Sequence, residues 1–252
     1  MYLSSLLIDI GDNPDRERPG RKWLRNLYHV HQRLCMAFPS ASRKSDDADF
    51  LEPFKPEDFD KQVHVARGTD AGFLFRMDPH PGGRVVILVQ SALEPDWDYA
   101  FHNADYLLAA PWQVKTFDPS FENDQRLKFR ILANPVRRVS ARSVDDKGQP
   151  LDEKWKGKRV PVPHDKLSEW LTRRGDNCGF RVEHLTVIQP GYVYIRGHNA
   201  ENPATDSGNR LFSTRFEGVI EVTDPIRLKQ TIISGIGSGK AFGFGLLSVA
   251  PL

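Results

Sequence analysis

Hydrophobic and polar positions alternate along the chain in blocks that predict its first elements. The apolar residues 2–10 suit a buried strand, and residues 11–20, rich in Asp, Arg and Pro, suit an exposed loop. From Trp23 to Phe38 the apolar positions recur with the spacing of one helical face, and Pro39 ends the pattern. The acidic, Pro-containing residues 40–70 then predict an irregular excursion.

The next blocks complete a β-α-β-β-α-β order. Residues 72–78 and 84–91 read as strands, and the PHPGG sequence between them predicts a tight turn and an antiparallel hairpin. A short helix over 96–108 and a strand over 112–117 follow.

The same order recurs after the polar junction at 118–124, without an obvious sequence repeat. The pattern predicts a strand over 126–141 interrupted at Asn134 and Pro135, a helix over 164–174, strands over 180–197 and 211–222, a helix from the N-cap Asp224 to 234, and a final strand over 245–250. The expected fold is therefore α+β, with two tandem ferredoxin-like (RRM-like) domains over residues 1–119 and 124–252. Each would be an antiparallel sheet with helices on one face, an architecture that hosts many functions.

Composition places the chain among folded globular proteins. Of its 252 residues 39% are hydrophobic and 10% aromatic, enough to build a core. The longest apolar run, Val85–Val89, is far too short to cross a bilayer, and the N-terminus lacks the features of a signal peptide, so we expect a cytoplasmic protein. Cys35 and Cys178 are far apart and outside any Cys/His cluster, which predicts buried free thiols and neither disulfides nor a metal site.

Charge is unevenly distributed along the chain. The net charge is only +2, but residues 126–174 contain 14 basic and 6 acidic residues and carry +8, whereas the remainder carries −6. A concentrated basic region of this kind is typical of a surface that contacts phosphates, although accidental clustering on a solvated surface is the alternative.

The most biased stretch is GIGSGKAFGFGLLSVAPL, at residues 235–252. It fails the P-loop pattern, since Ser234 stands where the first Gly should be and Ala241 follows Lys240, and the strand-loop-helix order that such motifs need is reversed. Two interpretations remain open. The glycines could let backbone amides approach phosphates, with Lys240 adding a charge, or they could form a helix C-cap and a bulged strand.

The predicted helix 23–38 contains the most reactive candidate side chains. Tyr28 and His31, three residues apart, share a face, whereas His29 points elsewhere, so His29 and His31 make a poor metal chelate. His31 lies on the apolar stripe, where a histidine considered alone is more often a core residue than a catalyst.

Several motifs together resemble the CasE-type CRISPR endoribonucleases. The resemblance rests on Leu-Tyr-x-x-His-Gln in the first helix, the Met-Tyr-Leu-Ser start and the Gly-Ile-Gly…Gly-x-Gly-Leu-Leu-Ser-x-Ala-Pro-Leu terminus. Arg130…Ala133-Asn134-Pro135, Arg159-Val160-Pro161 and Phe216-Glu217-Gly218 follow the family's segments in the expected order. Some relatives place Arg directly after the catalytic His, whereas here Gln32 stands there and Arg33 comes next.

The resemblance implies metal-independent cleavage of CRISPR repeat RNA beside a stem-loop, with no cofactor. It also implies retention of the mature crRNA and membership of the type I-E Cascade complex with its other subunits. The family's catalytic His and its Tyr partner fall on His31 and Tyr28. We expect the RNA-binding residues to be Arg130, Arg137, Arg138, Arg142, Lys156, Lys158, Arg159, Lys240, Gly235, Gly237, Gly239, Gly243 and Gly245.

Two other function classes stay open at this point. A non-catalytic subunit that only holds the guide RNA would share the basic region but would not cut the repeat. A ferredoxin-like scaffold for protein contacts would have no selective RNA affinity, and the basic segment argues against it.

Overall fold

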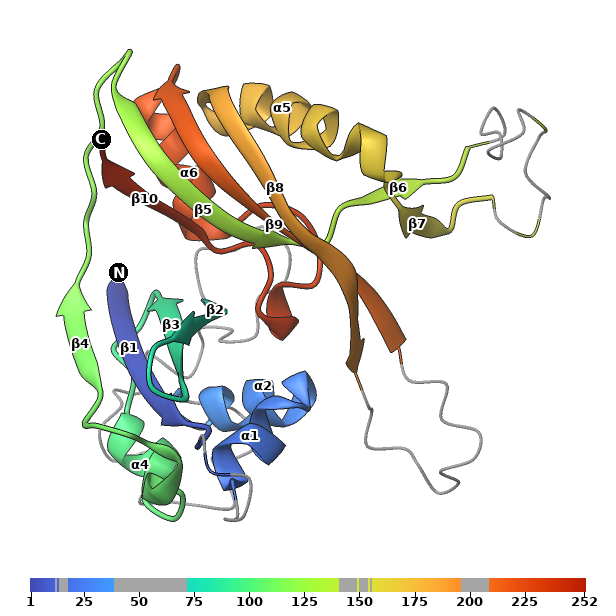
Figure 1. Ribbon diagram of the computed structural model, residues 1–252. Helices are drawn as coiled ribbons and strands as arrows, with labels where there is room; N and C mark the ends of the chain where they lie inside the picture. Colours follow the sequence, from blue (N-terminus) through green and yellow to red (C-terminus); the bar gives the residue numbers. More distant parts are fainter. Residues whose placement is uncertain are drawn as a thin grey trace.

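The computed structural model describes residues 1–11, 13, 18–38, 72–140, 149, 154, 156–195 and 209–252. Its two halves lie one above the other in Figure 1, each built on a four-stranded antiparallel sheet with helices packed on it. The expected α+β class is therefore confirmed. The predicted excursion at 40–70 and the candidate Arg142 fall outside the described residues.

The first sheet contains β1 (Tyr2–Asp9), β2 (Phe73–His80), β3 (Arg84–Ser91) and β4 (Gln113–Thr116) in the order β2-β3-β1-β4. Alternate residues of β1 and β3 point into the core, as in a sheet with helices on one face. The β2–β3 hairpin predicted from PHPGG is confirmed.

The helical stripe at 23–38 was predicted as one helix, and this was wrong. The structure has α1 (Pro19–Leu24), which begins inside the predicted loop, and α2 (Leu27–Cys35). The break occurs because the Asn26 side chain accepts a hydrogen bond from the Tyr28 backbone N–H at 3.1 Å and caps a new helix. Val30 and Leu34 of α2 pack into the core of the first half.

The helix predicted over 96–108 is also divided, into α4 (Trp97–Phe101) and the 3-10 turn η2 (Asp105–Leu107). Asp96 caps α4 by accepting from the Tyr99 N–H at 2.9 Å. The Asp105 carboxylate bonds to the Tyr106 N–H at 2.8 Å, a local contact that competes with continued helix.

The second sheet contains β5 (Arg126–Ala133), β8 (Phe180–Ile195), β9 (Asn209–Val222) and β10 (Leu247–Pro251) in the order β10-β5-β9-β8. The helices α5 (Leu167–Cys178) and α6 (Pro225–Ser234) share one apolar core with this sheet. The 3-10 turn η4 (His164–Lys166) precedes α5. The β6 (Val136–Arg138) and β7 (Arg159–Pro161) strands form a separate hairpin that extends beyond the sheet in Figure 1.

Helix ends in the second half follow their capping residues. Asp224 caps α6, as predicted, by accepting from the Arg227 N–H at 3.0 Å. The expected end of α5 at 174 was too early, because the helix continues until the left-handed Gly179, with φ of 79°, ends it.

The two cysteines differ in burial. Cys35 is buried as expected, whereas Cys178 is only half-buried, and this partial burial raises the pKa of the Cys178 thiol.

Buried polar contacts connect the two halves. The Arg76 guanidinium on β2, only 4% exposed, donates to the backbone oxygens of Leu246 at 3.2 Å and Arg130 at 3.3 Å and to Ser248 Oγ at 2.9 Å. Gln90 Nε2 on β3 donates to the Ile232 carbonyl at 2.8 Å. Because these bonds join β2 and β3 to α6 and β10, they set the orientation in which the halves meet.

In the part of the chain described above, we find no helix with the length and hydropathy of a membrane span.

Candidate functional site

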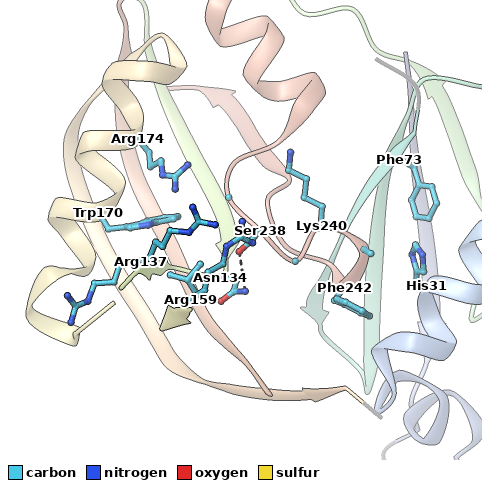
Figure 2. Close-up of a pocket in the computed structure, with 15 residues that line it drawn as sticks. His31, Phe73, Asn134, Arg137, Arg159, Trp170, Arg174, Ser238, Lys240 and Phe242 are labelled. Atoms are coloured by element: carbon cyan, nitrogen blue, oxygen red, sulfur yellow. Dashed lines mark hydrogen bonds between the residues drawn. The ribbon is translucent and has the colours of Figure 1, made fainter. Parts of the chain in front are cut away.

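A cavity of about 960 Å³ lies where the two halves face each other (Figure 2). His31 and Phe73 line it from the first half. The second half contributes Asn134, Val136, Arg137, Arg138, Arg159, Trp170, Arg174, Gly237, Ser238, Gly239, Lys240, Ala241 and Phe242. Five lining residues are cationic, and none of those in the described ranges is acidic, so the cavity is suited to a polyanion.

His31 reaches this cavity from α2. Its neighbours Val30 and Leu34 are fully buried, but the His31 side chain itself is half-buried and lines the cavity. Its imidazole stacks on Phe73, with ring centroids 5.6 Å apart, and Cys35 Sγ lies 3.5 Å from its Nε2. His31 therefore lies at the edge of the core, where its imidazole can contact a molecule bound in the cavity.

The structure does not bring Tyr28 to the same lining. Tyr28 is half-buried at the start of α2, and its ring lies 6.4 Å from that of the exposed His29. The residue that could have replaced the family's cation, Arg33, donates instead to the Ala100 carbonyl at 2.9 Å and to Asn103 Oδ1 at 2.8 Å. Arg33 thus connects α2 to the end of α4 and does not line the cavity.

The β6–β7 hairpin presents three of the expected arginines. Arg137, Arg138 and Arg159 are all exposed and line the cavity, and Arg138 faces Arg159 across the hairpin. Val162, buried in the second core, anchors the hairpin at its base, where its N–H donates to the Pro135 carbonyl at 3.0 Å. Val139 is buried at the far end of the paired strands. Lys156 and Lys158 are exposed on the same segment but lie outside the lining, so they extend the positive surface beyond the cavity.

The five candidate glycines divide into three groups. Gly237 and Gly239 line the cavity beside Lys240, whose ammonium donates to the Ser234 carbonyl. Gly235 is the C-cap of α6, which confirms the C-cap interpretation for that position. Gly243 and Gly245 are buried, and the Gly245 N–H bonds to the Leu132 carbonyl of β5 at 2.8 Å.

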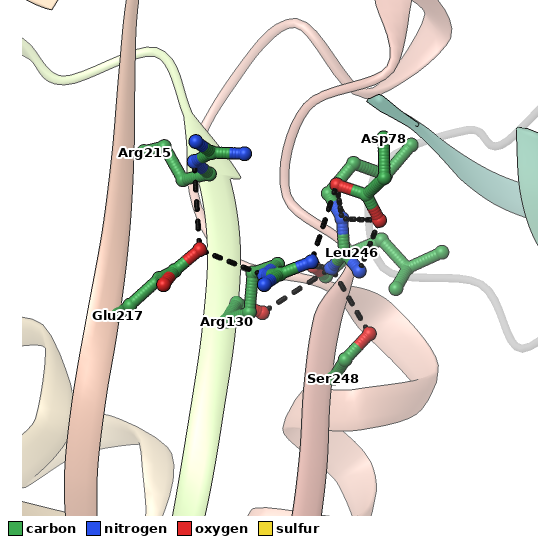
Figure 3. Close-up of polar contacts among 7 residues, drawn as sticks. Asp78, Arg130, Arg215, Glu217, Leu246 and Ser248 are labelled. Carbon is green, nitrogen blue, oxygen red and sulfur yellow. Dashed lines mark hydrogen bonds and ion pairs between the residues drawn. The ribbon is translucent and has the colours of Figure 1, made fainter. Parts of the chain in front are cut away.

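Arg130 lies apart from the cavity, in a network of charges on the second sheet (Figure 3). Its guanidinium is 2.8 Å from Glu217 and 3.9 Å from Asp78, the carboxylate that also pairs with Arg76 at 2.8 Å. Arg181 on the same sheet pairs with Glu221, a contact that raises the pKa of the arginine. Carboxylates on neighbouring strands therefore partly neutralise these cations. Within the described ranges, no such ion pair involves Arg137, Arg138 or Arg159.

Several cavity residues were not identified as site residues from the sequence. Arg174 lies over the ring of Trp170, 5.3 Å from its centroid, and Asn134 Nδ2 donates to Ser238 Oγ at 3.3 Å. Arg174 was counted only as part of the basic segment, and Asn134 only as an interruption of a strand and as part of a motif that resembles the family. Among the residues placed by the structure, no three His, Cys, Asp or Glu side chains cluster in a way that could hold a metal ion.

Comparison with known proteins gives consistent matches over the whole chain. The family model described as "CRISPR associated protein" matches residues 1–251. CRISPR-associated endoribonuclease Cse3 of Thermus thermophilus is 31% identical over 100% of both chains, and the CRISPR system Cascade subunit CasE of Escherichia coli K12 is 28% identical, also over 100% of both. A solved structure of CRISPR endoribonuclease Cse3 bound to a 19-nucleotide RNA matches with a TM-score of 0.68, 31% identity and full coverage of both chains.

The family model covers nearly the whole chain, and a curated relative exceeds 30% identity over its full length. The residues that carried the sequence resemblance, from Leu27 and Tyr28 to the terminal glycines, lie within the matched range. The chain therefore belongs to the Cse3/CasE (Cas6e) family of CRISPR-associated endoribonucleases.

Proposed function

We propose that this protein is a metal-independent endoribonuclease that cuts CRISPR repeat RNA next to a stem-loop. The observation that carries the proposal is the position of His31 in a cavity with five cationic lining residues and no acidic one among those described. The named relatives support it, since one is called an endoribonuclease and was solved with RNA bound.

The proposed reaction uses the RNA's own nucleophile. The ribose 2′-oxygen attacks the adjacent phosphorus, the bond from phosphorus to the 5′-oxygen breaks, and the proton lost by the 2′-hydroxyl is balanced by one gained at the departing oxygen. An imidazole titrates near neutral pH, so we assign proton transfer at either oxygen to His31. The products would be a 2′,3′-cyclic phosphate and a 5′-hydroxyl.

Other residues would bind and stabilise the phosphate. Lys240 lines the same cavity and is assigned to the charge that develops on the phosphorane. Tyr28, which lies outside the cavity lining, remains a proposed partner that orients the phosphate or shares proton transfer. Arg137, Arg138 and Arg159 would hold the backbone of the stem-loop.

The architecture behind this site is proposed to be two ferredoxin-like domains, residues 1–119 and 124–252. In each half, the first strand is central beside the third, and the second and fourth lie at the edges. That order, with helices after the first and third strands, fits a β-α-β-β-α-β unit.

We further propose that the protein stays bound to the mature crRNA within a cytoplasmic, multi-subunit Cascade-type complex. The support is the matched relative named as a Cascade subunit. The partners would be the precursor repeat stem-loop, the mature crRNA and the other subunits.

The decisive test compares His31→Ala with His29→Ala in buffer containing EDTA, using a repeat RNA hairpin as substrate. We expect His31→Ala to lose about 10²- to 10⁴-fold in cleavage rate with little change in hairpin affinity, because only proton transfer is removed. His29 is exposed on the same helix, so His29→Ala is the matched control, and this variant should cleave the RNA at the normal rate. Binding without cleavage by the unsubstituted protein would favour the alternative of a non-catalytic guide-RNA-binding subunit.

A further inference from the structure

The glycine-rich loop at residues 235–245 belongs to the second half but packs directly on the first. A Cβ added at Gly235 would lie 2.8 Å from Leu74 Cδ1, and one added at Gly243 would lie 3.1 Å from the Phe75 ring. Both glycines have left-handed backbones, with φ of 70° and 83°. Side chains at these positions would push the loop away from β2, so the glycines permit its close approach.

That approach places Phe242, in the 3-10 turn η5 (Lys240–Phe242), beside the proposed catalytic imidazole. The ring centroids of Phe242 and His31 are 6.4 Å apart at an interplanar angle of 52°. Phe73 stacks on the same imidazole at 5.6 Å and 26°. Figure 2 shows His31 next to both rings, one from each half of the chain.

The rings limit the orientations open to the imidazole. Aromatic pairs at these separations have preferred geometries, and a ring contacted by two others has few alternative rotamers that avoid a clash. The Cys35 sulfur, one turn along α2, occupies a third side. The remaining approach is from the cavity, which also contains Lys240.

We propose that Phe242 is a positioning residue for RNA cleavage: it holds the His31 imidazole against Phe73 in the orientation that proton transfer requires. This inference rests on the proposed function. It also gives the glycine-rich loop a role in docking the two halves, in addition to any contact of Gly237 and Gly239 with phosphate.

The expected effect is on rate and not on binding. Phe242→Ala would free one side of the imidazole, and small misplacements of a catalytic group have large kinetic effects. We expect cleavage at saturating RNA to slow by about 10-fold or more, while the Kd for the hairpin stays within about twofold because the lining cations are unchanged. Phe242→Tyr, which keeps the ring, should restore most of the rate. Tyr106→Ala, which removes an exposed aromatic ring outside the cavity lining, is the matched control.

A second measurement examines the contact without activity. The ring current of Phe242 should displace the His31 Cε1–H signal in NMR spectra of the full-length protein, and Phe242→Ala should move that signal while Tyr106→Ala leaves it in place. An unmoved signal would overturn the proposed contact, and wild-type cleavage by Phe242→Ala would overturn the positioning role. Equal loss of rate and affinity would show a structural role only. Failure of the unsubstituted protein to cut would instead overturn the proposed function, and the positioning role of Phe242 with it, even if the NMR signal moved.

Discussion

His31 and Arg33 lie two positions apart on α2 and point to different parts of the molecule. His31 lines the cavity, whereas the Arg33 guanidinium donates to the Ala100 carbonyl and Asn103 near the end of α4. Residues two apart on a helix project about 200° from each other, so neither can take the other's place. We therefore assign Arg33 a structural role, in which it stabilises the packing of α2 against α4.

Replacing Arg33 by Ala should reduce stability and leave RNA binding intact. We expect the free energy of unfolding to fall by about 1–2 kcal/mol, because two hydrogen bonds from a charged donor are lost at a partly exposed site. Urea denaturation measures this change, and Gln32→Ala, exposed on the same helix, should shift the value by less than about 0.5 kcal/mol. A large loss of RNA affinity in the Arg33 variant would contradict the assignment.

At the residue scale, the sequence was informative about His31 and not about its surroundings. Helical spacing placed His31 on the apolar face, and the motif resemblance made it a catalytic candidate. Phe73 and Phe242 come from distant segments, and local periodicity does not predict contacts between them. The same limit explains why Arg130 was grouped with the RNA-binding arginines: its partner Glu217 is on another strand, and only the β5–β9 register brings them together.

At the element scale, the β6–β7 hairpin separates the cations of the cavity from those of the sheet. The charge profile predicted a basic segment over 126–174, but it did not reveal that the strand interrupted at Asn134 turns into a separate hairpin. Cations on β5 and β8 face carboxylates on neighbouring strands, whereas Arg137, Arg138 and Arg159 face the cavity.

Neutralising the three hairpin arginines together should weaken RNA binding and its dependence on salt. If each contacts a phosphate, the slope of log K against log salt should decrease in magnitude by about 2 to 3, from the loss of counterion release. Fluorescence anisotropy over a range of salt concentrations gives the slope. Arg181→Ala, which removes a cation already paired with Glu221, is the control and should leave the slope unchanged. An unchanged slope in the triple variant would remove the hairpin from the RNA interface.

At the scale of the whole molecule, the cavity lies between two halves that each have an apolar core. Each half has its own apolar cluster, and the contact between halves includes the buried guanidinium of Arg76. The repeated β-α-β-β-α-β order could be predicted from sequence, since strands and helices leave periodic patterns. The relative placement of the halves could not, because a buried Arg on β2 has no periodic signature.

Arg76→Ala should destabilise the protein and reduce cleavage. We expect a loss of about 3 kcal/mol in unfolding free energy. Among the residues that the structure describes, Asp78 would keep the Arg130 guanidinium, 3.9 Å away, as its one ion-pair partner, and two backbone carbonyls would lose their donor. Chemical denaturation and single-turnover cleavage measure the two effects. Arg126→Ala, which breaks the exposed pair with Glu183, should cost less than about 1 kcal/mol. Normal stability in the Arg76 variant would show that the halves are joined mainly by apolar contacts.

The positioning role proposed for Phe242 has a consequence for when the chain could cleave RNA during its synthesis. Domains fold as they leave the ribosome, N-terminal first, so α2 and the first sheet can form while the second half is still being translated. His31 meets its second aromatic neighbour only after the glycine-rich loop, near the opposite end of the chain, has emerged and docked. A nascent or prematurely terminated chain would lack Phe242 and Lys240, so its His31 imidazole would not be held in position. We expect such a chain not to cleave the messenger RNAs that are being translated nearby.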